Sequence, residues 1–485
     1  MSLLLSFIAR LRWAFSAALR PAAAQTRQLA IDDIFDPVKR IDFNGSIPRI
    51  TWLPDGRSYL VTNEKGLWRV DASSGHEEPF LDVARFERSL AAIAGVAPAD
   101  ARAIATGTDF TFNSGFTAVL FTHGDDLYVY DIAANRAARL TSTPGEETNA
   151  SFSPDGRLVA FVRDANLYVV DVADSRERQL TTDGGPDRLN GRLDWVYEEE
   201  IYGRGETTGY WWSPDSAALA YLSLDERDVP TFVVPDDVPT DQRVEVTRYP
   251  QVGDPNPIVR VGAVPTAGGA TTWMDLSAYE PADRLVVRVG WSPDAKRVVY
   301  QVQNRVQSWL DLVAADARTG APARLLREQS AYWVDPIDTP AWQPDGSFLW
   351  LSDRTGFRHV YRYGADGRLA GTVTSGEWDV RNLYGVADGW VYFQASEHSP
   401  VANHVYRIRL DGTGMARYVE QDFAGKFLGV NTVNLRRFPD INNEVSEAQW
   451  REWQRRPPIT VDAANAVRDA LPAGTRWAIQ DIRWV

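Results

Sequence analysis

Three consecutive glutamates, residues 198–200, follow two aromatic residues, Trp195 and Tyr197, in one short segment of the chain. Carboxylates held close together repel one another, and a cation bound between them relieves that repulsion. A protonated amine supplies such a cation together with N–H donors for the carboxylate oxygens. These residue types therefore predict a site for a primary amine or a metal ion. The alternative is a solvated helical turn whose glutamates face only water.

The spacing of the three glutamates limits how many of them can contact one ligand. Successive residues of an α-helix point about 100° apart, so the three side chains cannot share a face. Two of them can converge on a compact ligand above the end of the helix, and the third then points elsewhere. Gly203 and Gly205 follow, and glycine allows the chain to leave a helix sharply. We therefore expect residues 193–205 to form a short helical insertion.

A repeated unit flanks this insertion and must supply its scaffold. Each copy has an aromatic residue, one further residue, then Pro-Asp and usually Gly, followed by alternating apolar residues. Proline presets φ at the second turn position, aspartate accepts a backbone N–H, and glycine tolerates the closing conformation. Each copy therefore predicts a tight turn in front of a β-strand. The five copies are Trp52 to Gly56, Phe152 to Gly156, Trp211 or Trp212 to Asp215, Trp291 to Asp294, and Trp342 to Gly346.

Two related units without the Pro-Asp turn, at residues 118–140 and 390–410, bring the total to at least seven. Units of about 40–50 residues with four short strands are typical of a β-propeller. We therefore predict an all-β fold, a β-propeller of seven or eight blades over residues 25–417. A stack of β-sandwiches is the alternative, although it does not require a fixed phase of the turn motif. Apolar residues at three- and four-residue spacing over 83–105 predict a short helical insertion near the first blades.

The ordered set of motifs around the glutamates resembles the propeller domain of the dipeptidyl peptidase IV family, which are prolyl oligopeptidase-type serine peptidases. A single Ser-Pro-Asp-Gly turn would be a weak indication, but the whole set in this order is specific, and the similarity covers most of residues 40–412. The segments that carry it are Asp194 to Glu200, Tyr210 to Asp215, Leu219 to Tyr221, Val229 to Pro230, Arg248 to Pro250, Gly253 to Pro257, and Ser352 to Tyr361.

This resemblance implies a role for the three glutamates and for the two aromatic residues before them. Glu199 and Glu200 would bind the free α-amine of a peptide, so that cleavage falls after its second residue. Glu198 would be structural, and Trp195 and Tyr197 would pack the insertion onto the blades. Peptide N-termini are thus the expected ligands, and the implied activity of the family is the release of N-terminal dipeptides.

The motif that would carry out this cleavage does not occur in the chain. The family's α/β-hydrolase domain presents its serine at a Gly-x-Ser-x-Gly turn, and the sequence contains no such pattern. It also has no cysteine, no His-Glu-x-x-His pair and no glycine-rich phosphate loop. We therefore expect that the α/β-hydrolase domain is absent and that this chain has no activity alone. We also expect no catalytic residue, no cofactor and no metal ion. A hydrolase domain and a second copy of the chain are further partners to consider.

A second interpretation keeps the fold and removes the peptidase. The chain would then be a stand-alone propeller, similar to TolB-like scaffolds, that acts as a non-enzymatic protein-interaction module. The two interpretations differ in one measurable property, because only the first predicts a preference for a free amine over an acetylated one.

The net charge and the two ends of the chain indicate further properties of the protein. The net charge of -14 disfavours nucleic acid as a partner and favours a cationic ligand. Residues 1–24 resemble a secretory signal whose apolar stretch is interrupted by Arg10, Arg12 and Arg20, so we expect a periplasmic or secreted protein. Residues 418–485 diverge from the blade pattern and contain helix-like stretches, which predicts an atypical, partly helical tail arising from a frameshift or a truncation.

Overall fold

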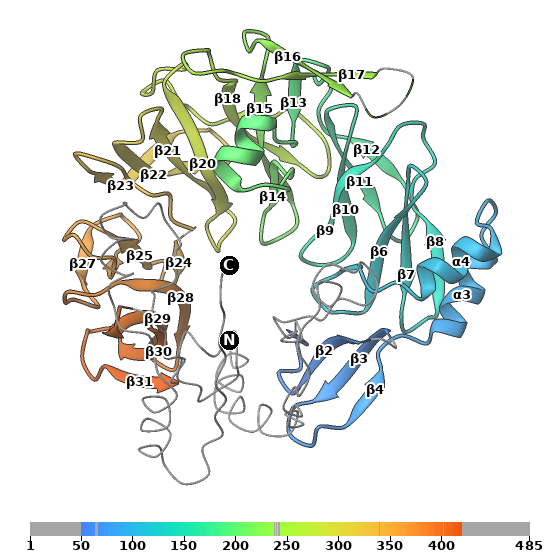
Figure 1. The fold of residues 1–485 in the computed structure, drawn as a ribbon, viewed down its shortest axis with the longest axis horizontal. Helices are drawn as coiled ribbons and strands as arrows, with labels where there is room; N and C mark the ends of the chain where they lie inside the picture. The colour runs from blue at the N-terminus through green and yellow to red at the C-terminus, as the bar shows by residue number, and fades with distance from the viewer. Residues whose placement is uncertain are drawn as a thin grey trace, which may run out of the picture.

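Seven sheets follow one another around a common centre in the computed structural model, from the blue sheet at the lower right of Figure 1 to the orange sheet at the lower left. The structure describes residues 50–419 except 64, 65, 237, 239, 241, 242, 339 and 401. The predicted propeller is thereby confirmed, with seven blades in the described part. The leader at 1–24 lies outside the described residues, so the periplasmic or secreted location stays a prediction. The predicted tail at 418–485 also lies outside them, apart from residues 418 and 419.

Each blade is an antiparallel sheet whose first strand lies nearest the centre (Figure 1). The first three blades and the helices between the first two consist of β1 (Ile50–Trp52), β2 (Ser58–Asn63), β3 (Gly66–Asp71), β4 (Glu77–Pro79), α3 (Val83–Ala91), α4 (Pro98–Ala105), β5 (Thr111–Phe112), β6 (Ala118–His123), β7 (Asp126–Asp131), β8 (Arg136–Arg139), β9 (Thr148–Phe152), β10 (Leu158–Arg163), β11 (Asn166–Asp171) and β12 (Glu177–Gln179).

The fourth blade has five strands and carries two additions, a short helix named η1 and a two-stranded hairpin. Its elements are β13 (Arg188–Asn190), η1 (Val196–Tyr202), β14 (Tyr210–Trp212), β15 (Ala218–Asp225), the hairpin strands β16 (Thr231–Asp236) and β17 (Arg243–Arg248), β18 (Ile258–Pro265) and β19 (Thr272–Trp273). The last three blades consist of β20 (Arg284–Trp291), β21 (Arg297–Asn304), β22 (Trp309–Asp316), β23 (Pro322–Gln329), β24 (Ala341–Trp342), β25 (Phe348–Ser352), β26 (His359–Tyr363), β27 (Leu369–Thr372), β28 (Val380–Ala387), β29 (Trp390–Ser399), β30 (Ala402–Arg409) and β31 (Ala416–Val419).

The repeated turn motif ends the first strand of a blade, as β9 of the third blade shows. The N–H of Gly156 donates to the carbonyl of Ser153 at 2.8 Å, which closes the turn. Asp155 Oδ1 accepts from the Ser153 hydroxyl at 2.7 Å and from the Arg157 N–H at 3.1 Å. The predicted use of aspartate as an acceptor of a backbone N–H group is therefore confirmed. The same motif ends β1, β14, β20 and β24.

Helices α3 and α4 form the helical insertion that was predicted over 83–105. The side chain of Asp82 accepts the N–H of Arg85 at 3.0 Å and thereby caps α3. The ring of Phe86 is fully buried and stacks on Tyr130 of β7, with centroids 4.0 Å apart. The insertion is therefore packed on the second blade. No helix in the described part of the chain is long and apolar enough to span a membrane.

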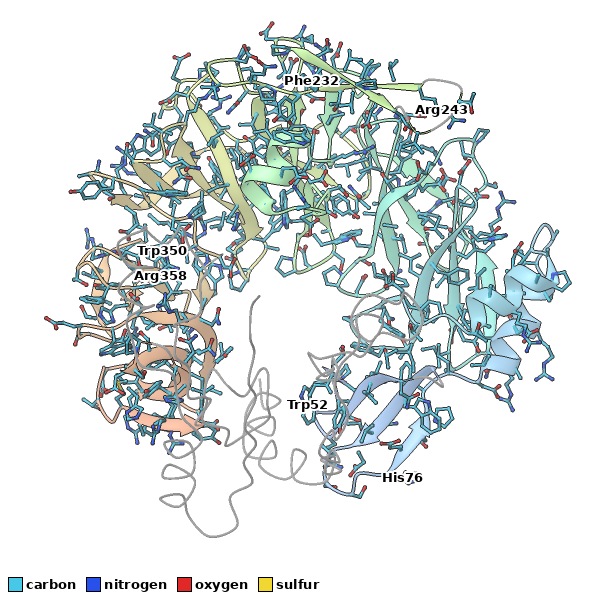
Figure 2. All side chains as sticks on the ribbon, in the orientation of Figure 1. Trp52, His76, Phe232, Arg243, Trp350 and Arg358 are labelled. Atoms are coloured by element: carbon cyan, nitrogen blue, oxygen red, sulfur yellow. The ribbon has the colours of Figure 1, made fainter. Side chains whose placement is uncertain are left out.

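The hairpin of β16 and β17 leaves the fourth blade between β15 and β18 and crosses the outer rim of the molecule (Figure 1). Figure 2 shows Phe232 near the base of this hairpin and Arg243 at its tip. All six residues of β16 are exposed, including Phe232, Val233 and Val234. The base of the hairpin nevertheless contributes to the site described next.

Candidate functional site

The first strand of the fourth blade is interrupted, and the glutamate segment grows from the interruption. β13 pairs with β15 at Asp225 to Ser223, and β14 pairs with the same strand at Tyr221 to Leu219. Both are antiparallel to β15, so they form two parts of one edge position, separated opposite Leu222. Residues 191–209 therefore leave and re-enter the sheet at one point, and the insertion stands on a rigid blade.

Glycines close the base of this insertion. The N–H of Gly191 donates to the carbonyl of Leu222 at 2.9 Å, and the N–H of Leu222 donates to the carbonyl of Gly209, also at 2.9 Å. The two glycines are also joined directly, because the Gly209 N–H donates to the Gly191 carbonyl at 2.9 Å. Gly191 has φ of +76°, and a Cβ there would lie 2.4 Å from Leu167. The positive φ and the close contact with Leu167 of β11 thus require glycine at this position.

Asp194 organises the start of η1. Its Oδ2 and Oδ1 accept the N–H groups of Val196 and Tyr197, each at 3.2 Å, which satisfies two donors at the helix start. Burial raises the pKa of this carboxyl to about 6 in spite of those two bonds. Glu226, after β15, is also buried, and burial followed by the charge of Asp194 raises its pKa to about 7. Two buried acids, Asp194 and Glu226, thus lie close enough to interact at the start of the insertion.

Two tyrosines fasten η1, which is the green helical turn in Figure 1, to the adjacent strand β20 of the next blade. Tyr197 is fully buried, and its hydroxyl accepts the N–H of Val286 at 3.3 Å. The hydroxyl of Tyr202 donates to the carbonyl of Val286 at 3.4 Å. These backbone groups are accessible because the pairing of β20 with β21 shifts register between Val286 and Arg288. Arg288 adds a bond from Nη1 to the carbonyl of Ile201 at 3.1 Å.

η1 is a π-helix rather than the α-helical turn used to interpret the sequence. The N–H of Gly203 donates to the carbonyl of Glu198, five residues back, at 2.9 Å. The chain then turns away at Gly203 and Gly205, with φ of 118° and 88°, so the sharp exit predicted there is present. π-Helical turns are rare and occur frequently at functional sites.

The three glutamates of η1 have different surroundings. Glu198 accepts the N–H of Gly205 at 3.2 Å, which ties the end of the insertion to its middle. Glu199 accepts two hydrogen bonds from Nε of Arg204, at 2.8 and 3.1 Å. The Arg204 side chain is 85% exposed, whereas that of Glu199 is 22% exposed. Glu199 thus already accepts an N–H group from a cation, the guanidinium of the exposed Arg204.

Glu200 lines a cavity of about 870 Å³. Trp195 and Tyr249 form part of its wall and contact each other, with ring centroids 4.2 Å apart. No nitrogen of Lys, Arg or His among the described residues lies within 4.0 Å of the Glu200 carboxylate. The complete lining is Trp195, Val196, Glu200, Ile201, Phe232, Tyr249, Pro250, Gln251, Val252, Asn256, Leu285, Arg305, Gln307 and Trp333.

The structure therefore separates the residues that the sequence grouped. Trp195 and Glu200 line the cavity, whereas Glu198, Glu199 and Tyr197 are not among its lining residues. Sequence reasoning missed three lining residues that follow β21 in the chain, Arg305, Gln307 and Trp333, because no motif marks them. Tyr249 and Pro250 had a signal, since Arg248 to Pro250 is one of the segments that carry the family resemblance. No group of three or more His, Cys, Asp or Glu side chains within the described ranges is arranged to hold a metal ion.

Comparison with known proteins gives a consistent match. A family model described as "Dipeptidyl peptidase IV (DPP IV) N-terminal region" matches residues 121–430. The chain is 30% identical over 260 residues to the probable dipeptidyl peptidase 4 of Trichophyton verrucosum, which covers 50% of this chain and 34% of that protein. It is 31% identical over 242 residues to the probable dipeptidyl peptidase 4 of Aspergillus fumigatus, covering 47% and 31%. The chain thus spans about a third of the length of these curated relatives.

Solved structures agree with the sequence comparison. The crystal structure of Porphyromonas gingivalis dipeptidyl peptidase 4 superposes with a TM-score of 0.68 at 26% sequence identity. The superposition covers 81% of this chain and 55% of that one. The similarity therefore extends over most of the propeller and includes the blade that carries η1.

Proposed function

Because the chain belongs to the family of the dipeptidyl peptidase IV N-terminal region, we propose that it is the propeller portion of a peptidase that releases dipeptides from peptide N-termini. Its part in that reaction is to bind the free α-amine of the peptide through Glu199 and Glu200. The proposal is confined to binding, because no Gly-x-Ser-x-Gly turn occurs in the sequence. Cleavage is assigned to a hydrolase domain that acts together with the propeller.

The observation that carries the proposal is the position of Glu200. Its carboxylate belongs to the wall of the cavity and has no ion-pair partner among the described residues. A primary ammonium group has three N–H donors and can satisfy more than one carboxylate. The neighbouring Glu199 supports this chemistry, since its oxygens already accept an N–H from Arg204. A ligand amine at the edge of the cavity above η1 would then contact Glu200 in the wall and the adjacent Glu199, which lies outside the lining.

The aromatic wall supports a peptide rather than a free amine ion as the ligand. Trp195, Tyr249 and Phe232 lie along one side of the cavity, and the rings of Phe232 and Tyr249 are 5.5 Å apart. Such side chains bury the apolar parts of a ligand while a few polar groups fix its orientation. Gln251 and Asn256 supply amide groups for a peptide backbone. The cavity therefore combines an acid for the amine with surfaces for the residues that follow it.

Titration calorimetry of the full chain with trialanine and with N-acetyl-trialanine tests the proposal. We expect acetylation to weaken binding at least tenfold, because a hydrogen bond to a charged group contributes roughly 1.5–3 kcal/mol. The double variant Glu199→Gln, Glu200→Gln should bind both peptides equally. Glu206→Gln is the matched control, since it removes one charge from an exposed position of the same insertion and should retain the preference.

Two results would count against the proposal. Equal binding of both peptides by the unmodified chain would favour the alternative, a protein-interaction module without an amine site. A preference for trialanine over N-acetyl-trialanine that survives in the double variant would show that the amine binds at another place in the molecule.

Replacing Arg204 by alanine should increase the affinity for trialanine. The arginine occupies Glu199 in the free protein, so a ligand amine must share this carboxylate or displace the arginine. Because the pair is exposed, we expect a gain of only about two- to fivefold. Calorimetry at low salt measures it, and raising the salt should reduce the difference between variant and parent.

A matched control and a negative result can be specified for this variant. Arg227→Ala removes another exposed arginine, which pairs with Asp225 at 2.6 Å, and should leave the affinity unchanged. A lower affinity in Arg204→Ala would mean that this arginine contributes to the site instead of competing for it.

A further inference from the structure

The cavity has a second charged side chain besides Glu200. Among its lining residues only Glu200 and Arg305 carry a formal charge, and they come from different elements. Glu200 belongs to η1, whereas Arg305 lies in the turn between β21 and β22. The function proposed above uses the acid and leaves the guanidinium without a role.

The turn that carries Arg305 is held firmly. The Gln307 N–H donates to the carbonyl of Asn304 at 2.8 Å, and the Val334 N–H donates to the carbonyl of Gln307 at 2.8 Å. The backbone N–H of Arg305 donates to Asp283 Oδ1 at 3.2 Å. The base of the side chain is therefore fixed, and a ligand would not have to order this loop.

The guanidinium of Arg305 is only partly used. Its Nη2 donates to the carbonyl of Asp254 at 2.6 Å, which aims the side chain along the loop between β17 and β18. None of the described carboxylates lies within 4.0 Å of its nitrogens, unlike those of Arg204 and Arg248, which pair with Glu199 and Asp187. A guanidinium has five N–H donors in a planar fork that matches a carboxylate. Donors of Arg305 are thus available on the cavity wall.

We propose that Arg305 binds the C-terminal carboxylate of a short free peptide whose amine is bound at η1. The amine end rests on the function proposed above, and the carboxylate end is independent of it. The cavity of about 870 Å³ has the size of a pocket for a small ligand and not for a folded chain. Recognition of both ends would make tripeptides or tetrapeptides the preferred class of ligand, since longer chains carry their carboxylate beyond the cavity.

Calorimetry with four peptides and the full chain tests this assignment. The peptides are trialanine, trialanine amide, hexaalanine and hexaalanine amide. Amidation removes the negative charge and one acceptor, so we expect trialanine amide to bind at least fivefold more weakly than trialanine. The two forms of hexaalanine should bind equally. An extended hexapeptide is about 20 Å long, so its C-terminal carboxylate would lie beyond the cavity and would not contact Arg305.

Variants assign the effect to one side chain. In Arg305→Gln, trialanine and its amide should bind equally. Arg305→Lys keeps the charge without the planar fork, so it should retain part of the difference in affinity between trialanine and its amide. Retention of that difference would also show that the site stays folded. Arg243→Gln is the matched control and should behave like the parent, because Arg243 lies at the exposed tip of the hairpin (Figure 2) and is not among the lining residues of the cavity.

The outcomes separate this inference from the function on which it partly rests. Equal binding of trialanine and its amide overturns the role of Arg305, even if acetylation still weakens binding. An effect of amidation without an effect of acetylation keeps Arg305 and overturns the amine site. An equal loss on amidation of hexaalanine contradicts the restriction to short peptides. Absence of binding by every form of trialanine overturns both proposals.

Discussion

Replacing Tyr197 by alanine should lower the free energy of unfolding by about 3–5 kcal/mol, the cost typical of removing a large aromatic ring from a packed core. The ring is fully buried in the cluster that contains Leu222, Val261 and Val286. It therefore joins the insertion to β15, β18 and β20 at once. Chemical denaturation followed by tryptophan fluorescence measures the loss.

Tyr197→Phe is the matched variant for this experiment. It keeps the ring and removes only the hydroxyl that accepts the Val286 N–H, so we expect a loss of about 1 kcal/mol. The alanine variant should also lose much of the preference for a free amine, because η1 would no longer be fixed above the blade. Equal losses in the two variants would show that the hydrogen bond, and not the packing of the ring, holds the insertion.

Replacing Glu226 by glutamine should raise the free energy of unfolding at pH 8 by an amount on the order of 3 kcal/mol. Burial raises the pKa of this carboxyl from its ordinary value of 4.5 to about 7, and the charge of Asp194 adds to the effect. The folded protein therefore holds the proton more tightly than the unfolded chain does. At pH 8 folding must bury the ionised form, and the amide removes that cost.

The advantage of the Glu226→Gln variant should depend on pH with a defined sign. A folded-state pKa above the unfolded one gives a stabilising contribution that is complete below about pH 4.5 and is lost as the pH rises through about 7. The parent and the variant should therefore become equally stable near pH 4.5. The charge of Arg248 opposes the rise in the pKa of Glu226. To a smaller extent Asp187 raises this pKa and Arg192 lowers it.

Glu245→Gln provides the control for this pH dependence, since Glu245 is exposed on β17 and should change stability little at either pH. A gain in Glu226→Gln that is the same at pH 5 and pH 8 would show that ionisation of this carboxyl is not its cause.

The propeller could be predicted from the sequence because its signal is local. Each Pro-Asp turn lies within a few residues of the strand that it ends, as in Phe152 to Gly156, so short-range preferences decide it. The helical insertion over 83–105 was equally visible from its periodicity. The second blade shows why motif counting is incomplete, since its turn has no Pro-Asp, and Asn113, at the position of Ser153, accepts the N–H groups of Thr117 and Ala118.

The glutamate segment could be located from the sequence, but its geometry could not. The bulge of β20 at Val286 lets two tyrosines of η1 bond to the backbone, and nothing in the segment itself indicates that contact. The pairing of Glu199 with Arg204 depends on a π-helical turn followed by a sharp exit. Arg305 reaches the cavity from another blade, a placement that only the tertiary fold determines.

A crystal structure of the full chain with bound trialanine would locate the amine of the peptide. We expect the peptide in the cavity beside η1, with its amine nitrogen about 2.7–3.2 Å from carboxylate oxygens of both Glu199 and Glu200. A peptide bound with its amine directed to solvent or to another part of the propeller would show that η1 is not the amine site.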